Sequence, residues 1–364
     1  MGVADAGDGS KRSRLLATGE RKDAASAVRL AKRLGLNLVS ADSLSIRRLR
    51  HGRGFRYVTA DGAPIRDPQT VARLKSLAVP PAYENVVFSE DPRAHLQAVG
   101  RDAAGRLQYR YHPDWDKVRE MRKARRLAAL AEALPRIRRS VARHLAGTEP
   151  TREFALAAVI ELVALSAIRA GGEAYARMNG SRGATTLLKS NVSLQGDETL
   201  TFGFRAKGGQ EVRKELQAPR LCRVVTILAR LPGRRLFQYR TETGDLRAAT
   251  ARDVNAFLRE IAGARISLKD FRTLLASVTA LDALAREAPA QAKRARRRQV
   301  LEAIRAAAAD LANTPATCAK SYVHDSVVNA FEKGVLERFA ETLRTSSPAQ
   351  REKVLAKLVA QAGA

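Results

Sequence analysis

Residues 152–173 read REFALAAVIELVALSAIRAGGE, and the apolar run within this stretch is the longest in the chain. Glu161 is the one charged residue of that run, which is shorter than the roughly 20 apolar residues that a bilayer span needs. A helix that is apolar on almost every side but too short for a membrane is typical of a domain core. The stretch therefore predicts a buried helix with Arg169 at its end, directly before a Gly-Gly pair that lets a ligand approach the backbone closely.

The residues after position 115 have mainly helical patterns. Residues 185–216 are the exception, because turn signals at Gly196-Asp197 and Gly208-Gly209 divide them into three short segments. Such spacing predicts a three-stranded antiparallel meander. We therefore expect residues 116–364 to form a mainly α domain that contains a small β-meander.

The residues before position 116 have a different character. Three short aromatic or β-branched segments predict strands, at 55–58, 85–88 and 107–111. Asp67-Pro68 is typical of a helix start, and Pro80-Pro81 of its end. We expect residues 36–115 to form a small β-rich domain and residues 1–35, which lack a sustained period, to form a flexible basic arm. The expected fold class is α+β, with a β-rich N-terminal domain and a larger, mainly helical one.

The charge of the chain is strongly unbalanced. Its 364 residues include 65 Lys and Arg against 37 Asp and Glu, a formal net charge of +28. Apolar residues make up 45% of the chain, so the excess charge belongs to a folded protein rather than to a disordered basic tail. Such a balance predicts a polyanionic partner.

The sequence does not contain the residue patterns that disulfide frameworks, metal sites and nucleotide sites require. Cys222 and Cys318 are too few and too far apart for a disulfide framework or a zinc site, and the five histidines have no metal-binding spacing. The chain has no Gly-rich Lys-Ser/Thr loop for a nucleoside triphosphate, and its first residues carry neither an export signal nor a myristoylation signal. We expect no metal, nucleotide or other cofactor, no membrane partner and a cytoplasmic location.

Four positions combine a cation or a nucleophile with a break in regular structure. Arg169 follows the apolar run, Lys207 lies beside a predicted hairpin turn, and Arg272 shares a helix face with Lys269. Tyr322 stands among small and polar residues. Each has an ordinary alternative: a helix-end arginine on terminal carbonyls, a solvated lysine, a basic solvent-facing stripe and a half-buried core tyrosine.

Taken together, the segments that hold these residues resemble the type IB DNA topoisomerases, specifically their poxvirus-like and bacterial branch, across roughly residues 38 to 350. The matching segments, in the order and separation of the family, are AIRAGGE at 167–173, FRAKG at 204–208, KDFRT at 269–273 and NTPATCAKSY at 313–322. GRLQYRY at 105–111 also matches and belongs, in the family, to a β-rich clamp that touches DNA.

The resemblance implies an enzyme that relaxes supercoiled duplex DNA. One strand is cut through a 3′-phosphotyrosyl link, swivels and is religated, without ATP or metal. The implied catalytic residues are Tyr322 as nucleophile, Arg169, Arg272 and Asn313 as phosphate ligands and Lys207 as general acid; the implied DNA contacts are Gln108, Tyr109, Tyr111 and Lys269. The implied partner is duplex DNA, clamped by a monomer in the nucleoid.

The match departs from the family pattern at two positions. Asn313 stands where the viral enzymes have histidine, as in the bacterial members, so this ligand can donate a hydrogen bond but supplies no charge. Leu274 stands where bacterial relatives have an aromatic residue, which concerns packing alone.

Two other functions compete with this interpretation. A tyrosine site-specific recombinase shares the nucleophile and the two arginines, but usually has histidine where Lys269 stands and a helical clamp domain. A non-catalytic basic DNA-binding protein would account for the net charge but not for the ordered set of residues.

Overall fold

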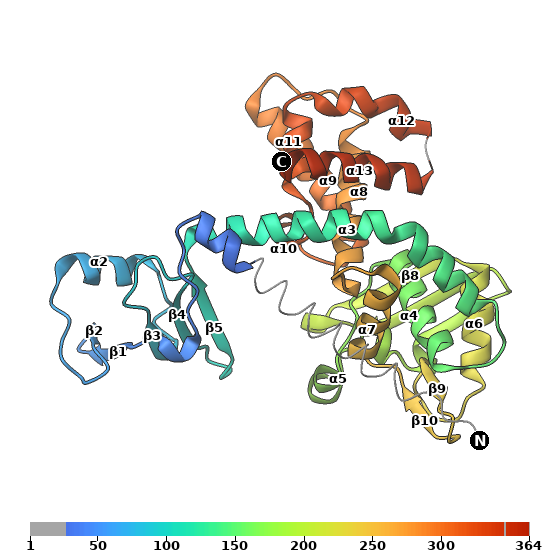
Figure 1. Ribbon diagram of the computed structural model, residues 1–364, viewed down its shortest axis with the longest axis horizontal. Helices are drawn as coiled ribbons and strands as arrows, with labels where there is room; N and C mark the ends of the chain where they lie inside the picture. The colour runs from blue at the N-terminus through green and yellow to red at the C-terminus, as the bar shows by residue number, and fades with distance from the viewer. Residues whose placement is uncertain (1–26, 346, 364) are drawn as a thin grey trace, which may run out of the picture. The chain divides into compact units, whose positions relative to one another are not determined.

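The computed structural model describes residues 27–345 and 347–363 (Figure 1). The chain separates into two units, Met1–Arg122 and Lys123–Ala364. The boundary expected at residue 115 lies near the start of α3 (Pro113–Leu145), whereas the separation falls inside this helix. The first turns of α3 therefore belong to the first unit.

The first unit contains a five-stranded antiparallel sheet in the order β2-β1-β3-β4-β5. The strands are β1 (Ile46–His51), β2 (Gly54–Val58), β3 (Glu84–Phe88), β4 (Leu96–Arg101) and β5 (Leu107–Tyr111). Strands β2, β3 and β5 coincide with the three predicted segments, while β1 and β4 add two more. β1 is rich in arginine, and the guanidinium of Arg48 lies 4.3 Å from the ring centre of Phe55 on β2.

One helix covers the core of this sheet. α2 (Pro68–Ser76) begins at Asp67, whose side chain accepts a hydrogen bond from the Thr70 backbone N–H at 2.7 Å. Leu74 of this helix is buried in a cluster with Tyr57 and Phe88, whose rings meet edge to face. The predicted helix and its cap are thus present, ending before Pro80-Pro81.

The end of the expected flexible arm is ordered. Residues 27–33 are helical, and Leu30, Ala31 and Leu36 are buried against Trp115 and Val118 of α3. The expectation of a flexible arm reaching residue 35 was therefore wrong for this part, because these apolar side chains pack on the start of α3. Residues 1–26 lie outside the described residues.

The second unit is built around α4 (Arg152–Ser166), the apolar helix of the opening stretch. Its first turn is capped by Thr151, whose hydroxyl accepts from the Phe154 N–H at 3.2 Å, and almost every side chain from Phe154 to Val163 is buried. The helix ends at Ala167, whose φ of 50° places it in the left-handed region. No helix in the described residues is long and apolar enough to cross a membrane.

Further helices and strands complete the second unit, and several of them pack against α4. The helices are α5 (Glu173–Asn179), α6 (Pro219–Ala229), α7 (Ala251–Ala262), α8 (Leu268–Leu284), α9 (Lys293–Asp310), α10 (Pro315–Ser321), α11 (Asp325–Glu332), α12 (Ala340–Thr345) and α13 (Pro348–Gly363). The strands are β6 (Val192–Gln195), β7 (Thr199–Arg205), β8 (Glu211–Gln217), β9 (Gln238–Arg240) and β10 (Leu246–Ala248). Strands β6, β7 and β8 form the predicted antiparallel meander, and the α+β fold class is confirmed.

Candidate active site

Arg169 is held by its backbone. The chain leaves α4 through Ala167, and the carbonyl of Arg169 then accepts a hydrogen bond from the Ala184 N–H at 2.8 Å. Gly183 packs so closely on this segment that a Cβ at its position would lie 2.5 Å from the Arg169 carbonyl oxygen. The segment beside η2 (Ala184–Thr186) therefore fixes the peptide that carries Arg169.

Arg272 lies inside the protein. It is only 3% exposed, and its guanidinium donates Nη1–H to the Ala167 carbonyl and Nη2–H to the Leu311 carbonyl, the latter at 3.1 Å. Lys269, on the same helix, is exposed. The alternative of a basic solvent-facing stripe is therefore wrong for Arg272, which joins the ends of α4 and α9.

Asn313 meets Arg169 across these two chain ends. α9 closes at Leu311, and Ala312 adopts a φ of 46° before Asn313. The Oδ1 atom of Asn313 accepts a hydrogen bond from Nη2 of Arg169 at 2.5 Å, although 144 positions separate the two residues.

Tyr322 follows α10 and is fixed from α8. The Ser277 hydroxyl on α8 donates to the Tyr322 carbonyl at 3.2 Å and accepts from the His324 N–H at 3.0 Å. The guanidinium carbon of Arg272 lies 4.9 Å from the centre of the Tyr322 ring. One helix therefore holds both the arginine and the backbone of the tyrosine.

The surroundings of Tyr322 favour its ionised form. Burial, which leaves 9% of the residue exposed, would by itself raise the pKa of the hydroxyl. The positive charge of Arg272 and a hydrogen bond with it, together with the charges of Arg169 and Lys269, act in the opposite direction and lower the pKa below its ordinary value. A tyrosine with a lowered pKa is a better nucleophile at neutral pH.

Two donors at this place have no acceptor. Nε of Arg272 and Nδ2 of Asn313 are buried without a hydrogen-bond partner among the described residues. Unpaired buried donors are costly, and such groups call for an explanation. An anionic ligand with several oxygens would satisfy both donors, whereas the described residues contain no group of His, Cys, Asp and Glu that could hold a metal ion.

Lys207 stands apart from these four residues. It lies in η4 (Lys207–Gly209), the exposed turn between β7 and β8, where Gly208 has a φ of 81°. Its side chain makes no hydrogen bond or ion pair within the described parts of the chain. Ala206, its neighbour, lines one pocket together with Arg169 and Arg272, so the lysine begins at the edge of the site with a free side chain.

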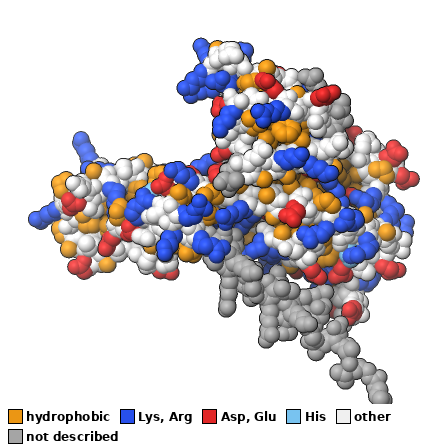
Figure 2. Space-filling model, turned by 45° about the horizontal axis from the view of Figure 1, so that its top comes forward, with side chains coloured by type: hydrophobic (Ala, Val, Ile, Leu, Met, Phe, Trp, Pro, Cys, Tyr) orange, Lys and Arg blue, Asp and Glu red, His pale blue; other side chains and the backbone are white. Residues whose placement is uncertain are grey.

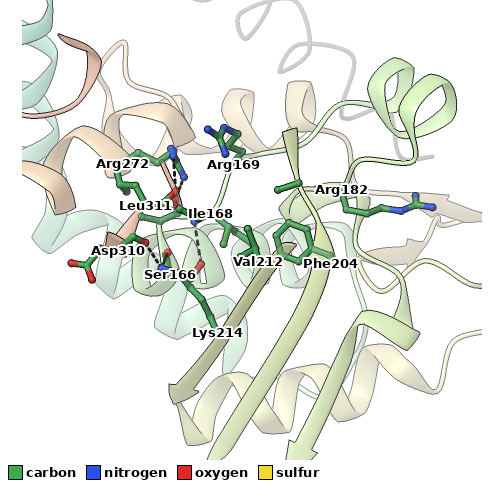
Figure 3. A pocket seen from close by; sticks show the side chains of 13 residues that line it. Ser166, Ile168, Arg169, Arg182, Phe204, Val212, Lys214, Arg272, Asp310 and Leu311 are labelled. Carbon is green, nitrogen blue, oxygen red and sulfur yellow. Dashed lines mark hydrogen bonds between the residues drawn. The ribbon is translucent and has the colours of Figure 1, made fainter. Parts of the chain in front are cut away.

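Lys214 lines the same pocket and was not predicted. Its Nζ atom donates to the Ser166 carbonyl at 2.7 Å and to the Asp310 carbonyl (Figure 3). The sequence offered a signal, because Val212, Lys214 and Leu216 alternate along β8 and form its inner face. A lysine on the inner face of a strand needs a partner inside the protein.

The DNA-contact candidates of the first unit lie on two faces of β5. Tyr109 is 44% exposed, and its ring stacks on that of Tyr111 with 6.2 Å between centres; Tyr111 stacks on Trp115 in turn. Gln108 points to the opposite face, where its amide donates to Asp102 at 2.9 Å. The structure thus forms an aromatic row from two of the three candidates and separates the third from it.

Basic side chains recur across the surface (Figure 2). The start of α9 is one example: its first turn has no acidic residue, and its exposed side chains are Lys293, Arg294, Arg297 and Arg298. Cations are unfavourable at a helix N-terminus unless an anion offsets them. This surface agrees with the polyanionic partner that the composition predicts.

Comparison with known proteins identifies the family. The family model of the eukaryotic DNA topoisomerase I catalytic core matches residues 112–346, and that of the bacterial DNA topoisomerase IB N-terminal domain matches residues 54–102. A DNA topoisomerase 1B of Acanthamoeba polyphaga mimivirus is 28% identical over 294 residues, 79% of this chain and 87% of the viral protein. The core match alone covers more than half of the chain, which therefore belongs to the type IB DNA topoisomerase family, a family of isomerases.

Proposed function

We propose that the protein relaxes supercoiled duplex DNA by cutting one strand, letting it swivel and religating it. The observation that carries this proposal is the environment of Tyr322. Its hydroxyl has a lowered pKa beside Arg272, and two buried donors that have no partner in the described part of the chain accompany it. A scissile phosphodiester supplies both the electrophile that such a tyrosine needs and the oxygens that such donors lack.

The reaction is a transesterification that conserves the number of phosphoester bonds. The Tyr322 oxygen forms a bond to the scissile phosphorus as its proton leaves to water, and the bond from phosphorus to the 5′ oxygen breaks. Lys207 acts as the general acid and gives a proton to the departing oxygen. The product is a 3′-phosphotyrosyl enzyme with a free 5′-hydroxyl, and religation is the reverse, so ATP is not needed.

The phosphate ligands divide into charged and neutral donors. Arg169 and Arg272 stabilise the non-bridging oxygens as negative charge builds on them, and Asn313 adds a neutral hydrogen bond. Arg272 donates two N–H groups to backbone carbonyls, and its Nε–H, which has no partner among the described residues, is the donor for the phosphate. This set of cations supplies the charge that a metal ion gives elsewhere.

The duplex is held mainly through its phosphates. The net charge of +28 supplies sequence-independent affinity, and the protein acts as a monomer that clamps DNA with both units. Lys269, exposed at the start of α8, and the aromatic row of Tyr109 and Tyr111 contact the duplex, and Gln108 does so from the other face of β5.

A covalent-trapping experiment tests this function. The full-length protein is mixed with a duplex labelled at the 5′ end of the scissile strand, in EDTA and without ATP, and is denatured at intervals. We expect the label to remain attached to a peptide that contains Tyr322, and plasmid DNA to be relaxed under the same conditions. Attachment of the other DNA end, or a strict requirement for magnesium or ATP, would contradict the proposal; joining of two separate specific sites would indicate a recombinase.

A further inference from the structure

Arg169 and Asn313 each follow the C-terminus of a helix at the same spacing. Ser166 is the last residue of α4 and lies three residues before Arg169; Asp310 is the last residue of α9 and lies three residues before Asn313. The carbonyls at such helix ends have no partner within the helix and carry partial negative charge. A cation placed between them can therefore join the two ends.

Two cations do so in parallel. Lys214 donates to the carbonyls of Ser166 and Asp310, and Arg272 donates to the carbonyls of the next residues, Ala167 and Leu311 (Figure 3). Lys214 arrives from β8, whereas Arg272 belongs to α8. The two helix ends are thus tied twice, at consecutive residues, by side chains from independent elements.

The tie made by Arg272 belongs to a residue that also takes part in the proposed reaction. In the proposed function this guanidinium keeps both carbonyl contacts and offers its Nε–H to the phosphate. Lys214 is half-buried, and its pKa is lowered, mainly by burial and also by the charge of Arg272, while Asp310 opposes this change. Its Nζ donates to both helix ends, and its side chain lines the same pocket as Arg169 and Arg272.

We propose that Lys214 is a positioning residue, which holds the ends of α4 and α9 together so that Arg169 and Asn313 face one phosphate at the correct spacing. The inference rests on the proposed function. The Arg169–Asn313 hydrogen bond at 2.5 Å is the immediate result of this spacing. Lys214 therefore acts on cleavage through two other residues and touches neither the DNA nor the reacting atoms.

The test compares Lys214→Met with a matched lysine variant. Met keeps the apolar stem but removes the charge and the donors. Lys189 is the control, because it is also half-buried and also donates Nζ–H to a carbonyl just beyond a helix end, that of Leu231 after α6. Both variants are made in the full-length chain, and their thermal unfolding midpoints are measured.

Cleavage and binding are then measured separately. Single-turnover formation of the covalent adduct at saturating enzyme reports the cleavage rate, and duplex affinity is measured in a Tyr322→Phe background. We expect Lys214→Met to slow cleavage at least tenfold while affinity changes less than threefold, and Lys189→Met to cleave within threefold of the unmodified protein. Equal cleavage by Lys214→Met and the unmodified protein would overturn the inference.

A double-variant comparison separates positioning from general stability. If Lys214 acts through Asn313, adding Lys214→Met to Asn313→Ala should slow cleavage by much less than the product of the two single effects. Added to Lys207→Ala, which affects the leaving group, the same change should retain its full effect. Independent effects with Asn313→Ala would show a general structural role and would overturn the inference.

Lys214→Arg keeps the test decisive if Lys214→Met does not fold. It retains charge and donors on a longer, planar group and should displace the two helix ends, so we expect a slower cleavage rate that is again coupled to Asn313. A rate equal to that of the unmodified protein, or an effect independent of Asn313, overturns the inference. Failure of the proposed function is distinct, because the unmodified protein would then form no covalent adduct.

Discussion

Arg169 donates a hydrogen bond to Oδ1 of Asn313, which leaves the Nδ2 donor of that amide buried and without a partner among the described residues. The arginine thereby decides which end of the amide is available to a ligand. A phosphate oxygen that approaches Asn313 meets a donor rather than an acceptor. The pair is thus one unit in which the cation orients its neutral neighbour.

Substitutions at Asn313 should distinguish the loss of its amide from a change in the group that this side chain presents to the phosphate. Asn313→Ala removes one neutral donor, and we expect single-turnover cleavage to slow by about tenfold, whereas Arg169→Ala should slow it by roughly 10²–10³ as for loss of an oxyanion donor. Asn313→Asp should be more damaging than Asn313→Ala, because it keeps the bond to Arg169 but presents negative charge to the phosphate. An Asp variant more active than the Ala variant would contradict this orientation.

The ionisation of Tyr322 can be measured directly. In the free protein its pKa lies below the ordinary value of 10.0, because the charge of Arg272, a hydrogen bond with it and the charges of Arg169 and Lys269 together outweigh the effect of burial. The difference in ultraviolet titration between the unmodified protein and Tyr322→Phe should therefore show one tyrosine that ionises below pH 10. Lys269→Met removes a lowering charge and should move this ionisation to higher pH.

Lys320→Met is the matched control for that titration. Lys320 is close to Tyr322 in sequence and exposed, but its charge is not among those that lower the pKa of the tyrosine. We expect the Lys320 variant to leave the ionisation where it is. An equal shift in both variants would mean that net charge, rather than the position of Lys269, sets the pKa.

The role of Lys207 as general acid can be tested by changing the leaving group of the cleaved strand. Lys207→Ala should cleave ordinary DNA slowly, because the departing 5′ oxygen needs a proton. A substrate with sulfur at that bridging position leaves as a thiolate without an acid, so the variant should regain most of the normal rate on it. Arg272→Ala, whose defect lies at the non-bridging oxygens, should recover far less.

The opposite result for Lys207 would also be informative. If Lys207→Ala is equally slow on the oxygen and sulfur substrates, this lysine binds or positions the phosphate and does not donate the proton. Lys269 is then the first candidate for the general acid, since its charge is felt at Tyr322.

Gly183 tests the backbone support of Arg169. In Gly183→Ala the new Cβ would lie 2.5 Å from the Arg169 carbonyl oxygen and equally close to the Gly171 nitrogen, so the segment must shift. We expect a loss of about 1–3 kcal/mol in unfolding free energy, as for overpacking, together with slower cleavage. Gly203→Ala in β7, where no atom of residues 27–345 or 347–363 lies within 4 Å of the added methyl group, should change neither.

The sequence pattern predicted those elements that are stabilised by interactions between residues close together in the chain. The apolar helix α4, the Asp67 cap of α2 and the hairpin turns of the meander each follow from neighbouring residues and were predicted. β1 was not, because IRRLRH has few apolar residues and gains its place from pairing with β2 and β3. Residues 27–33 were assigned to an arm because their packing partners, Trp115 and Val118, are far away in sequence.

In the candidate active site, too, contacts between residues distant in the chain could not be predicted from the sequence. The resemblance to a family named Arg169, Arg272, Asn313 and Tyr322, and these four lie together in the structure. Spacing along α8 gave no indication that Arg272 is buried, because the carbonyls that compensate its charge belong to helix ends 105 and 39 positions away. Lys214 was missed for the same reason.

α8 carries Arg272 and, five residues later, Ser277, which holds the Tyr322 backbone. An α-helix rises about 1.5 Å and turns about 100° per residue, so the intervening segment sets both the separation and the relative direction of these two side chains. Substitutions within it preserve that relation. An insertion or deletion of one residue does not, because it would rotate the serine away from the tyrosine while the arginine stayed in place. The length of this segment is therefore constrained more strictly than its composition.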